Sequence, residues 1–277
     1  MNDLAKLSVV VCVRNEEKRI RDCLESIYAN DPDEVIVVDG NSSDRTIAIA
    51  REFPGIHIIE SKGSNLTRDR QKGIDAAKNN LIAMIDGDHR LRNGDLASLL
   101  KDLREFDLDM VQSALAAHDG AGFWEKAEES TWDVSVNTPP GVRTMVGTAP
   151  AIYTKRLFKY VRFDDTITST VDDADLMYRI SKFPNLKVGM GRTRIRQYHF
   201  ATLRSYLKKF LMYGKGDGEF CRKHPERALG MIYHILVRYP VVYSFRLIRS
   251  GHPEAIPFVV FQGFFRFIGL VRYFLPI

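Results

Sequence analysis

The chain has 277 residues, of which 45% are hydrophobic and 27% charged, and this composition excludes a disordered protein. The length allows one large domain, or one domain with an appendage, around a sizeable core. A net charge of +5 favours an anionic partner such as a nucleotide, a phospholipid surface or nucleic acid. The three cysteines have no metal-like spacing, which excludes a disulfide framework and fits a reducing compartment.

The sequence predicts neither a secretory signal nor a spanning helix. The apolar run at 7–13 is short and is followed by RNEEKR, so it lacks the form of a signal peptide. A spanning helix needs roughly 18 apolar residues, and no uncharged run approaches that length. We therefore expect a cytoplasmic protein that at most lies on the inner surface of the membrane.

The first hundred residues alternate between β-branched runs and segments with helical periodicity. We expect strands at 7–13, 34–39, 56–61 and 81–86, and helices at 16–29, after an N-cap at Ser43 or Asp44, and at 66–79. This alternation predicts a parallel sheet whose functional residues gather at the carboxyl ends of the strands. Asp39 and Asp86 both lie at such ends.

From about residue 92 the pattern becomes less regular. We expect a helix at 94–106, a strand at 109–117, an irregular region around GAGFW and NTPPGVR, and a helix that begins near 172. Long irregular stretches in an α/β domain commonly form substrate loops. The sequence thus predicts a catalytic domain over 1–200, with a nucleotide-binding half at about 1–91 and an acceptor half at about 92–200.

The C-terminal region, 201–277, has the pattern of amphipathic helices. A basic helix is predicted at 203–213, before the segment GKGDG, and two apolar segments punctuated by arginine follow at 228–249 and 255–277. One interpretation is a helical subdomain packed on the catalytic core. The other is in-plane association with an anionic membrane, in which the arginines remain at the headgroups and the aromatic side chains enter the interface.

Carboxylates mark the strand ends. Asp39 follows an apolar strand and can accept hydrogen bonds from a ribose or base, although the turn GNSS could also be a simple helix cap. Asp86 and Asp88 flank one glycine, an arrangement that suits a divalent cation bound together with a diphosphate but is also typical of a β-turn. His89 is a further candidate ligand.

Two more groups of side chains suggest chemistry. Asp172, Asp173 and Asp175 open a helix in larger number than capping requires, so one of them could be a general base. His199 ends a probable strand and precedes the basic helix, which makes it a candidate metal or phosphate contact.

Taken together and in order, these motifs resemble glycosyltransferase family 2, inverting enzymes of the GT-A fold that use nucleotide-diphosphate sugars. The resemblance runs over residues 7–215. It is carried by VVVCVRNEE, VIVVDGNSSDRT, RQKGID, AMIDGDHRL in the place of the DxD motif, FDDTITSTVDDADLMYRI, and QYHFATLRSYLKKFLMYGKG. The chain departs from the family at three positions, because Gly40 replaces the second loop aspartate, Gln71 replaces an asparagine, and Asp172 replaces the glutamate before the base.

The resemblance implies a fold, a donor and a set of roles. The fold is a GT-A (Rossmann-like) mixed, mostly parallel sheet flanked by helices, with the C-terminal helical region appended. Asp173 is implied as the catalytic base, and Asp88 and His199 as ligands of Mn²⁺ or Mg²⁺. The implied donor-binding residues are Val13, Arg14, Glu16, Asp39, Arg70, Asp86 and Gly87.

The implied reaction is metal-assisted single displacement from a nucleotide-diphosphate sugar, UDP-linked by expectation, to the hydroxyl of a glycan or lipid-linked acceptor in cell-envelope polysaccharide synthesis. No nucleic-acid partner is expected. A haloacid-dehalogenase-like phosphatase would use Asp86 as its nucleophile. This alternative is disfavoured because the nucleophile of such phosphatases normally ends the first strand, whereas Asp86 ends a later one. A Rossmann dehydrogenase would need a GxGxxG that is not present, and an inactive membrane-associated scaffold would lack carboxylates that this chain retains.

Overall fold

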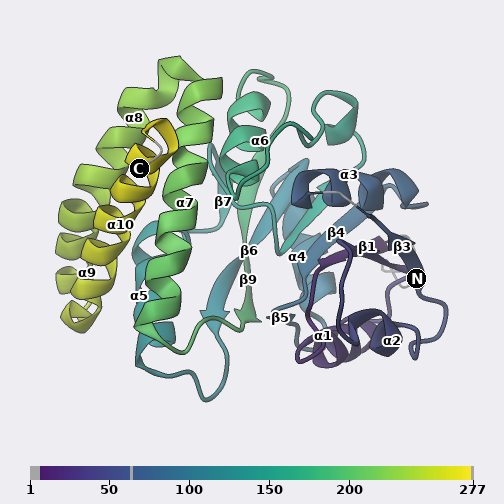
Figure 1. Ribbon diagram of the computed structural model, residues 1–277. Helices are drawn as coiled ribbons and strands as arrows, with labels where there is room; N and C mark the ends of the chain where they lie inside the picture. The colour runs from purple at the N-terminus through teal and green to yellow at the C-terminus, as the bar shows by residue number, and fades with distance from the viewer. Residues whose placement is uncertain (1–6, 63–64, 276–277) are drawn as a thin grey trace. The chain divides into compact units, whose positions relative to one another are not determined.

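The computed structural model describes residues 7–62 and 65–275 (Figure 1). The chain divides into two compact units. The first contains the chain up to Ala116 together with Pro139–Thr168 and Leu176–Tyr198, and the second contains Ala117–Thr138, Ser169–Asp175 and the chain from His199 onward. Each unit draws on separated stretches of the sequence.

The described residues of the first unit build a nine-stranded mixed sheet, in the order β3-β2-β1-β4-β8-β6-β9-β5, with β7 paired to β9. Its strands are β1 (Leu7–Val13), β2 (Glu34–Asp39), β3 (His57–Glu60), β4 (Leu81–Asp86), β5 (His89–Arg90), β6 (Met110–Ala117), β7 (Gly141–Arg143), β8 (Ala151–Thr154) and β9 (Val188–Gln197). The first four are parallel, and the register pairs Val13 with Asp39 and Cys12 with Asp86. The predicted α/β class with a mixed sheet is confirmed, and the carboxyl ends of β1, β2 and β4 are level.

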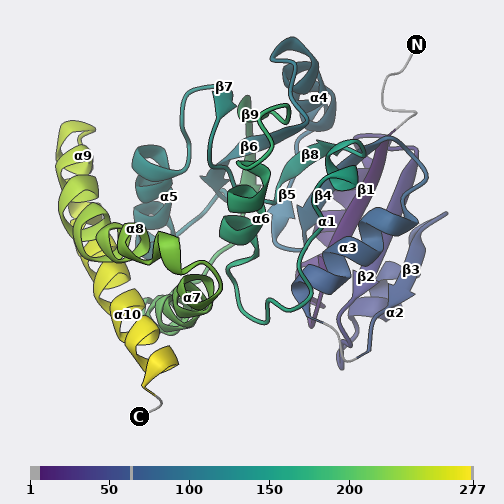
Figure 2. The ribbon, with the colours of Figure 1, turned by 90° about the horizontal axis from the view of Figure 1, so that it is seen from above.

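Helices cover both faces of this sheet because successive strand residues point to opposite sides. Val9 and Val11 belong to one apolar core, and Val10 and Cys12 to another. The first core is covered by α1 (Ile20–Tyr28), α2 (Thr46–Ala50) and α4 (Asp95–Glu105). The second is covered by α3 (Leu66–Ala76), the 3₁₀ turn η2 (Leu157–Lys159) and the end of α6 (Asp172–Ile180). Figures 1 and 2 show α3 on the opposite face from α1 and α2.

Three of the four predicted N-terminal strands have the expected bounds, whereas helix α1 begins later than expected. The backbone N–H groups of Glu16 and Glu17 donate to Thr46 Oγ1 and Asp44 Oδ2, at 2.8 and 3.1 Å. These two residues therefore belong to a loop that is bound to the β2–α2 connection, and the helix starts only at Ile20.

The second unit is helical. Its elements are α5 (Phe123–Ser135), α7 (Leu203–Lys223), η3 (Pro225–Arg227), α8 (Ala228–Tyr233), the π-helical η4 (His234–Tyr243), α9 (Ser244–Arg249), η5 (Pro253–Ala255) and α10 (Ile256–Phe274). The prediction that a helix ends before GKGDG was wrong, because α7 continues through that segment. A side chain at Gly214 or Gly218 would collide with α10, so these glycines permit close helix packing.

One described helix, Pro253–Phe274, is long and apolar enough to cross a membrane, which by itself is weak evidence for a span. The sequence predicted an amphipathic helix here but no candidate span, because the two arginines of the segment interrupt every uncharged run. One of them, Arg266, pairs with Asp217 of α7 at 2.6 and 2.8 Å and donates to the Tyr239 hydroxyl at 2.7 Å. The helix is thus fastened along one side to its neighbours.

Candidate active site

The loop after β2 is organised by the Asp39 carboxylate. This buried group accepts hydrogen bonds from the Ser42 N–H, at 3.1–3.2 Å, and from the Ser42 hydroxyl, at 2.5 Å. Asn15 and Asn41 adopt positive φ angles of 56° and 69°, which asparagine tolerates better than most residues. Asp39 therefore closes the turn at the carboxyl end of the sheet. The prediction of an N-cap at Ser43 or Asp44 was wrong, because the N-cap of α2 is Arg45, whose side chain makes no capping hydrogen bond.

At the end of β4, Asp86 is held by a buried arginine. Arg70 of α3 is only 5% exposed, and its Nη2 lies 3.2 and 3.1 Å from the two carboxylate oxygens of Asp86. Its Nη1 donates to Thr148 Oγ1 at 2.6 Å. Because both ends of the guanidinium are engaged, Arg70 presents a fixed positive charge at this edge of the sheet.

Asp88 lies in the turn between β4 and β5, where the far end of β9 holds it. The Tyr198 N–H donates to the Asp88 carbonyl oxygen at 2.9 Å, and Gln197 Nε2 donates to its carboxylate at 3.0 Å. Gly87 between the two aspartates packs closely on the first loop, since a Cβ there would lie 3.3 Å from both Glu16 and Val13.

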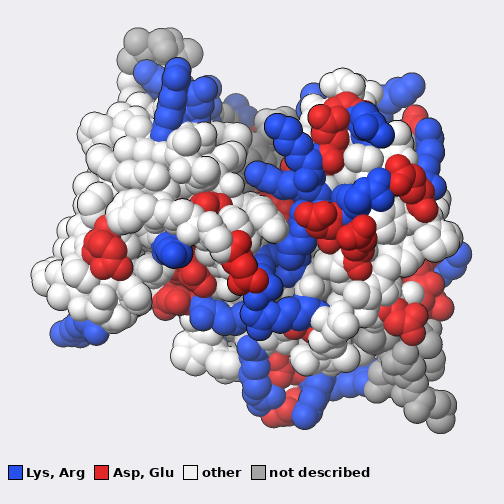
Figure 3. Space-filling model, turned by 90° about the horizontal axis from the view of Figure 1, so that it is seen from below, with Lys and Arg blue, Asp and Glu red and all other residues white. Residues whose placement is uncertain are grey.

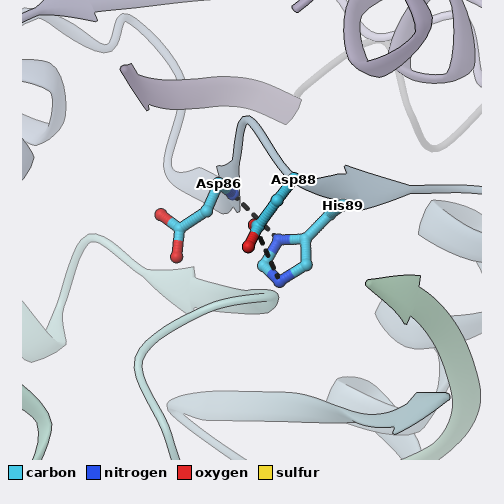
Figure 4. A group of neighbouring side chains, drawn as sticks. All are labelled: Asp86, Asp88 and His89. Atoms are coloured by element: carbon cyan, nitrogen blue, oxygen red, sulfur yellow. Dashed lines mark hydrogen bonds and ion pairs between the residues drawn. The ribbon is translucent and has the colours of Figure 1, made fainter. Parts of the chain in front are cut away.

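His89 follows directly, and its ring orientation decides its role. The Asp86 N–H donates to His89 Nδ1 at 2.9 Å, so Nδ1 carries a lone pair and Nε2 carries the ring proton. Nε2 lies 3.9 Å from Asp88 Oδ1 (Figure 4). In this tautomer His89 has no lone pair on Nε2 for a metal ion, and its proton faces the Asp88 carboxylate.

The residues fit a divalent cation held mainly by Asp88. Ligand atoms of Asp86, Asp88 and His89 lie within 4.8 Å of one another. Figure 4 shows the Asp86 carboxylate turned away from the other two side chains, and Arg70 neutralises it. Burial raises the pKa of Glu16, and the nearby carboxylates Asp88 and Asp44 add to that effect although Arg19 opposes it. An excess of negative charge with oxygen donors suits Mg²⁺ or Mn²⁺.

The second unit contains a buried charged cluster around Glu128 of α5. His199 Nδ1 lies 2.9 Å from Glu128 Oε2, Lys209 Nζ lies 3.3 Å from Oε1, and the Tyr206 hydroxyl donates at 2.7 Å. Burial alone would raise the pKa of Glu128, but Lys209 and His199 outweigh it and lower the pKa to about 2. Glu128 is therefore an anion at neutral pH.

The cluster fixes the orientation of His199. Its ring packs against Trp132 with the ring centroids 4.7 Å apart, and Nδ1 faces the Glu128 carboxylate. In the described part of the chain no group bonds to Nε2, which is buried. A histidine that donates one ring N–H to a carboxylate and keeps the other nitrogen for a ligand has the arrangement common among metal-binding histidines.

The three aspartates at the start of α6 differ in their surroundings. Asp175 is 1% exposed and lies 2.7 Å from Lys223 Nζ and 2.8 Å from His224 Nε2. Asp172 is also buried, whereas Asp173 is partly exposed, and its Oδ1 accepts a hydrogen bond from the Ala174 N–H at 2.7 Å. Asp173 is thus the one of the three that is accessible to solvent.

The first unit brings together, near the carboxyl ends of β1, β2 and β4, all seven residues predicted to bind the sugar-nucleotide donor and the predicted metal ligand Asp88. The seven are Val13, Arg14, Glu16, Asp39, Arg70, Asp86 and Gly87. Asp173 and His199 belong to the second unit. Sequence reasoning missed Gln197, Thr148, Glu128 and Asp69. Only Asp69 carried a local signal, since it directly precedes Arg70 in the chain.

A mixed α/β sheet with an acidic turn after its fourth strand resembles the arrangement of GT-A-type glycosyltransferases. Residues 8–186 match the family model Glycosyl transferase family 2, and the chain belongs to this family. This family assignment speaks against the phosphatase and dehydrogenase alternatives.

Curated relatives and solved structures agree with this assignment. A dodecaprenyl-phosphate galacturonate synthase of Rhizobium johnstonii is 33% identical over 117 residues, which cover 38% of this chain and 35% of that protein. The glycosyltransferase SunS of Bacillus subtilis is 33% identical over 117 residues, which cover 40% of this chain and 28% of that protein. This chain thus spans about a third of the length of these relatives.

Among solved structures, S. aureus TarS 1–349 in complex with UDP-GlcNAc is 15% identical, with a TM-score of 0.60 over 93% of this chain and 81% of that one. The crystal structure of S. aureus TarS 1–349 has a TM-score of 0.58 over 98% of this chain and 92% of that one, at 16% identity. At these identities the likeness establishes the fold.

The Glu128 cluster predicts an acid-sensitive second unit. Because the folded pKa lies below the ordinary value of 4.5, the ionised carboxylate stabilises the fold above pH 4.5, and this stabilisation is lost as the pH falls toward 2. Glu128→Gln should lower the free energy of unfolding at pH 7 by about 3–5 kcal/mol and flatten its dependence on pH below 4.5. Denaturant titrations at several pH values measure both effects.

The neighbouring Glu129→Gln is the matched control and should change the free energy of unfolding by less than about 0.5 kcal/mol. Equal effects of the two substitutions would contradict the assignment of a stabilising role to Glu128.

Proposed function

We propose that this glycosyltransferase inverts configuration at the anomeric carbon while moving a sugar from a UDP-sugar to an acceptor hydroxyl. The observation that carries the proposal is the turn that contains Asp88. It follows β4 and is held by Gln197 of β9, and the Arg70–Asp86 ion pair lies beside it. The structural neighbour with UDP-GlcNAc bound supports a nucleotide-sugar donor. The galacturonate synthase, whose name includes dodecaprenyl phosphate, supports a lipid-linked acceptor over a soluble one.

The donor is proposed to lie above the carboxyl ends of the parallel strands. There Val13, Arg14, Glu16 and the Asp39 loop face the nucleoside, as ligands do at the switch point of parallel sheets. Asp86, oriented by Arg70, faces the ribose, and Gly87 lets the chain approach the diphosphate closely.

Asp88 would hold Mn²⁺ or Mg²⁺, and the cation would stabilise negative charge on the departing diphosphate. His199, which the resemblance implies as a further ligand, belongs to the second unit, and Nε2 is the ring nitrogen it would use. His89 is not proposed as a ligand, because its ring proton is on Nε2, 3.9 Å from Asp88 Oδ1. Glu128 in turn holds His199 in the tautomer that leaves Nε2 for the ligand.

Asp173 is the proposed base. Its carboxylate would take the proton from the acceptor hydroxyl as that oxygen attacks the anomeric carbon from the side opposite the nucleotide. Asp175 is unsuited to this role because Lys223 and His224 neutralise it in a buried position.

We place the enzyme at the inner face of the membrane as a peripheral protein bound through its helical unit. Exposed apolar side chains line the outer helices, including Leu229, Tyr233, Phe245, Ile248, Phe264 and Phe274. Residues 228–249 and 256–277 contain arginines but no Asp or Glu. The left side of Figure 3, over these helices, is covered mainly by uncharged residues.

A pocket of about 240 Å³ between α7 and α10 adds a feature suited to a lipid phosphate. Its lining includes the cations Lys208, Lys215 and Arg272 and the apolar side chains of Leu211 and Met212. Cations around an apolar floor match the phosphate and acyl ends of an anionic lipid.

Donor binding is tested by thermal unfolding with UDP-sugars and Mn²⁺. At a hundredfold excess over Kd the wild type should gain about 2.7 kcal/mol, and Asp88→Ala should lose the Mn²⁺-dependent part. Asp22→Ala, an exposed carboxylate on α1, is the matched control and should behave as the wild type. If no UDP-sugar shifts the melting temperature and Asp88→Ala matches the wild type, the donor-site proposal fails.

The base is tested by Asp173→Asn, which should keep donor binding and melting temperature but lower kcat at least a hundredfold, since general bases contribute about 10²–10⁴. Asp175→Asn should instead lower the melting temperature, because it unpairs Lys223 and His224. Loss of donor binding in Asp173→Asn would indicate a structural role and contradict the assignment.

Membrane binding is tested by flotation of the full chain with phosphatidylcholine vesicles, with and without phosphatidylglycerol. Binding should require the anionic lipid, and the variant Lys208→Gln/Lys215→Gln/Arg272→Gln should partition about a hundredfold less, at about 1 kcal/mol per cation. A control with the same loss of charge in the first unit, Lys101→Gln/Arg104→Gln/Lys182→Gln, should float like the wild type. Equal flotation of the two variants would show that the pocket is not the lipid contact.

A further inference from the structure

Asp69 of α3 is a buried carboxylate to which the proposed function gives no role. Its side chain lies in the first turns of the helix and the residue is only 5% exposed. Within residues 7–62 and 65–275, no group donates a hydrogen bond to Oδ1. Burying an ionised carboxylate without such donors is costly, so a group of this kind in a folded protein calls for an explanation.

The surroundings of Asp69 indicate what it faces. A Cβ built on Gly40 would lie 3.1 Å from Asp69 Oδ2, 3.5 Å from the Val13 carbonyl oxygen and 3.6 Å from Arg14 Cβ. The Asp69 carboxylate thus lies where a side chain at position 40 would project, directly after Asp39 and beside the end of β1. Position 40 is also where this chain has glycine in place of the second loop aspartate.

Neither neighbouring acid can take over this position. The Asp39 carboxylate already accepts both the N–H and the hydroxyl of Ser42. Asp86 is bound to Arg70. A carboxylate in the first turn does interact favourably with a helix N-terminus, but that interaction is also available to an exposed side chain and does not account for burial.

We propose that Asp69 supplies, from helix α3, the carboxylate that the β2 loop lacks at Gly40, and that it accepts a hydrogen bond from the nucleoside of the donor. The partner is either the N3–H of uracil or the ribose 2′-hydroxyl, both of which are hydrogen-bond donors. The inference rests on the proposed donor site and adds a residue that determines nucleotide affinity and selectivity.

The test measures Kd by calorimetry for UDP, CDP and 2′-deoxy-UDP with Mg²⁺. Asp69→Ala should weaken UDP binding about ten- to a hundredfold, the range for a hydrogen bond to a charged group. If the partner is the base, CDP binding should not change, because cytosine has no N3–H. If the partner is the ribose, 2′-deoxy-UDP binding should not change.

Exchange of the two positions provides the matched control. Gly40→Asp/Asp69→Ala should recover most of the UDP affinity, because the 3.1 Å contact is removed and the other neighbours of a Cβ at position 40 lie at 3.5 Å or beyond. Gly40→Asp alone should weaken binding, since it places two carboxylates together. Gly40 has an ordinary backbone φ, so the substitution itself causes no strain.

The outcomes separate this inference from the proposed function. If the wild type binds no UDP, the donor-site proposal fails. If the wild type binds UDP and Asp69→Ala binds it equally well, or loses all three nucleotides equally, the role of Asp69 is refuted while the donor site remains. Thermal unfolding adds a second readout: Asp69→Ala should not lower the melting temperature, and a fall with unchanged UDP affinity would identify a structural carboxylate.

Discussion

The candidate site in the first unit depends on the register of three parallel strands, β1, β2 and β4, whose carboxyl ends lie side by side. The pairing of Val13 with Asp39 and of Cys12 with Asp86 fixes where the carboxyl ends of β1, β2 and β4 meet. This register brings several carboxylates to one edge of the sheet, where they would repel one another without compensation. Arg70 compensates part of this charge from a buried position, and the remaining negative charge makes the edge suitable for a cation.

His89 of the first unit and His199 of the second show how the hydrogen bond made by one ring nitrogen determines what the other nitrogen can do. A backbone N–H occupies His89 Nδ1, whereas a carboxylate faces His199 Nδ1. Nε2 of His89 therefore carries a proton, whereas Nε2 of His199 keeps a lone pair for a ligand, although both residues are histidines. The sequence AMIDGDHRL does not predict which nitrogen of His89 carries the proton, because that depends on how the turn folds.

Local patterns predicted the bounds of β1, β2 and β4 to the residue, because runs of β-branched residues and the residues that end them are adjacent in the sequence. They also placed Asp39 and Asp86, which end β2 and β4, and Asp88, which lies two residues beyond β4. The Glu128 cluster and the Gln197 contact could not be predicted this way, because each joins residues about 70 or more positions apart. Helix α7 was predicted too short because glycines usually break helices, whereas here Gly214 serves tight packing against α10.

The hydrogen bond from Gln197 to Asp88 closes a chain segment of 109 residues. Closing so long a segment costs more chain entropy than closing a short one, and non-local contacts of this kind slow folding. The parallel strands β1 and β2, which are close in sequence, can thus pair before the acidic turn acquires its final shape. The family match ends at residue 186, so a chain shortened to that boundary would keep the parallel strands and lose the β9 residues that hold the turn. The acidic turn at the carboxyl edge of the sheet is therefore complete only after β9 has paired with the rest of the sheet.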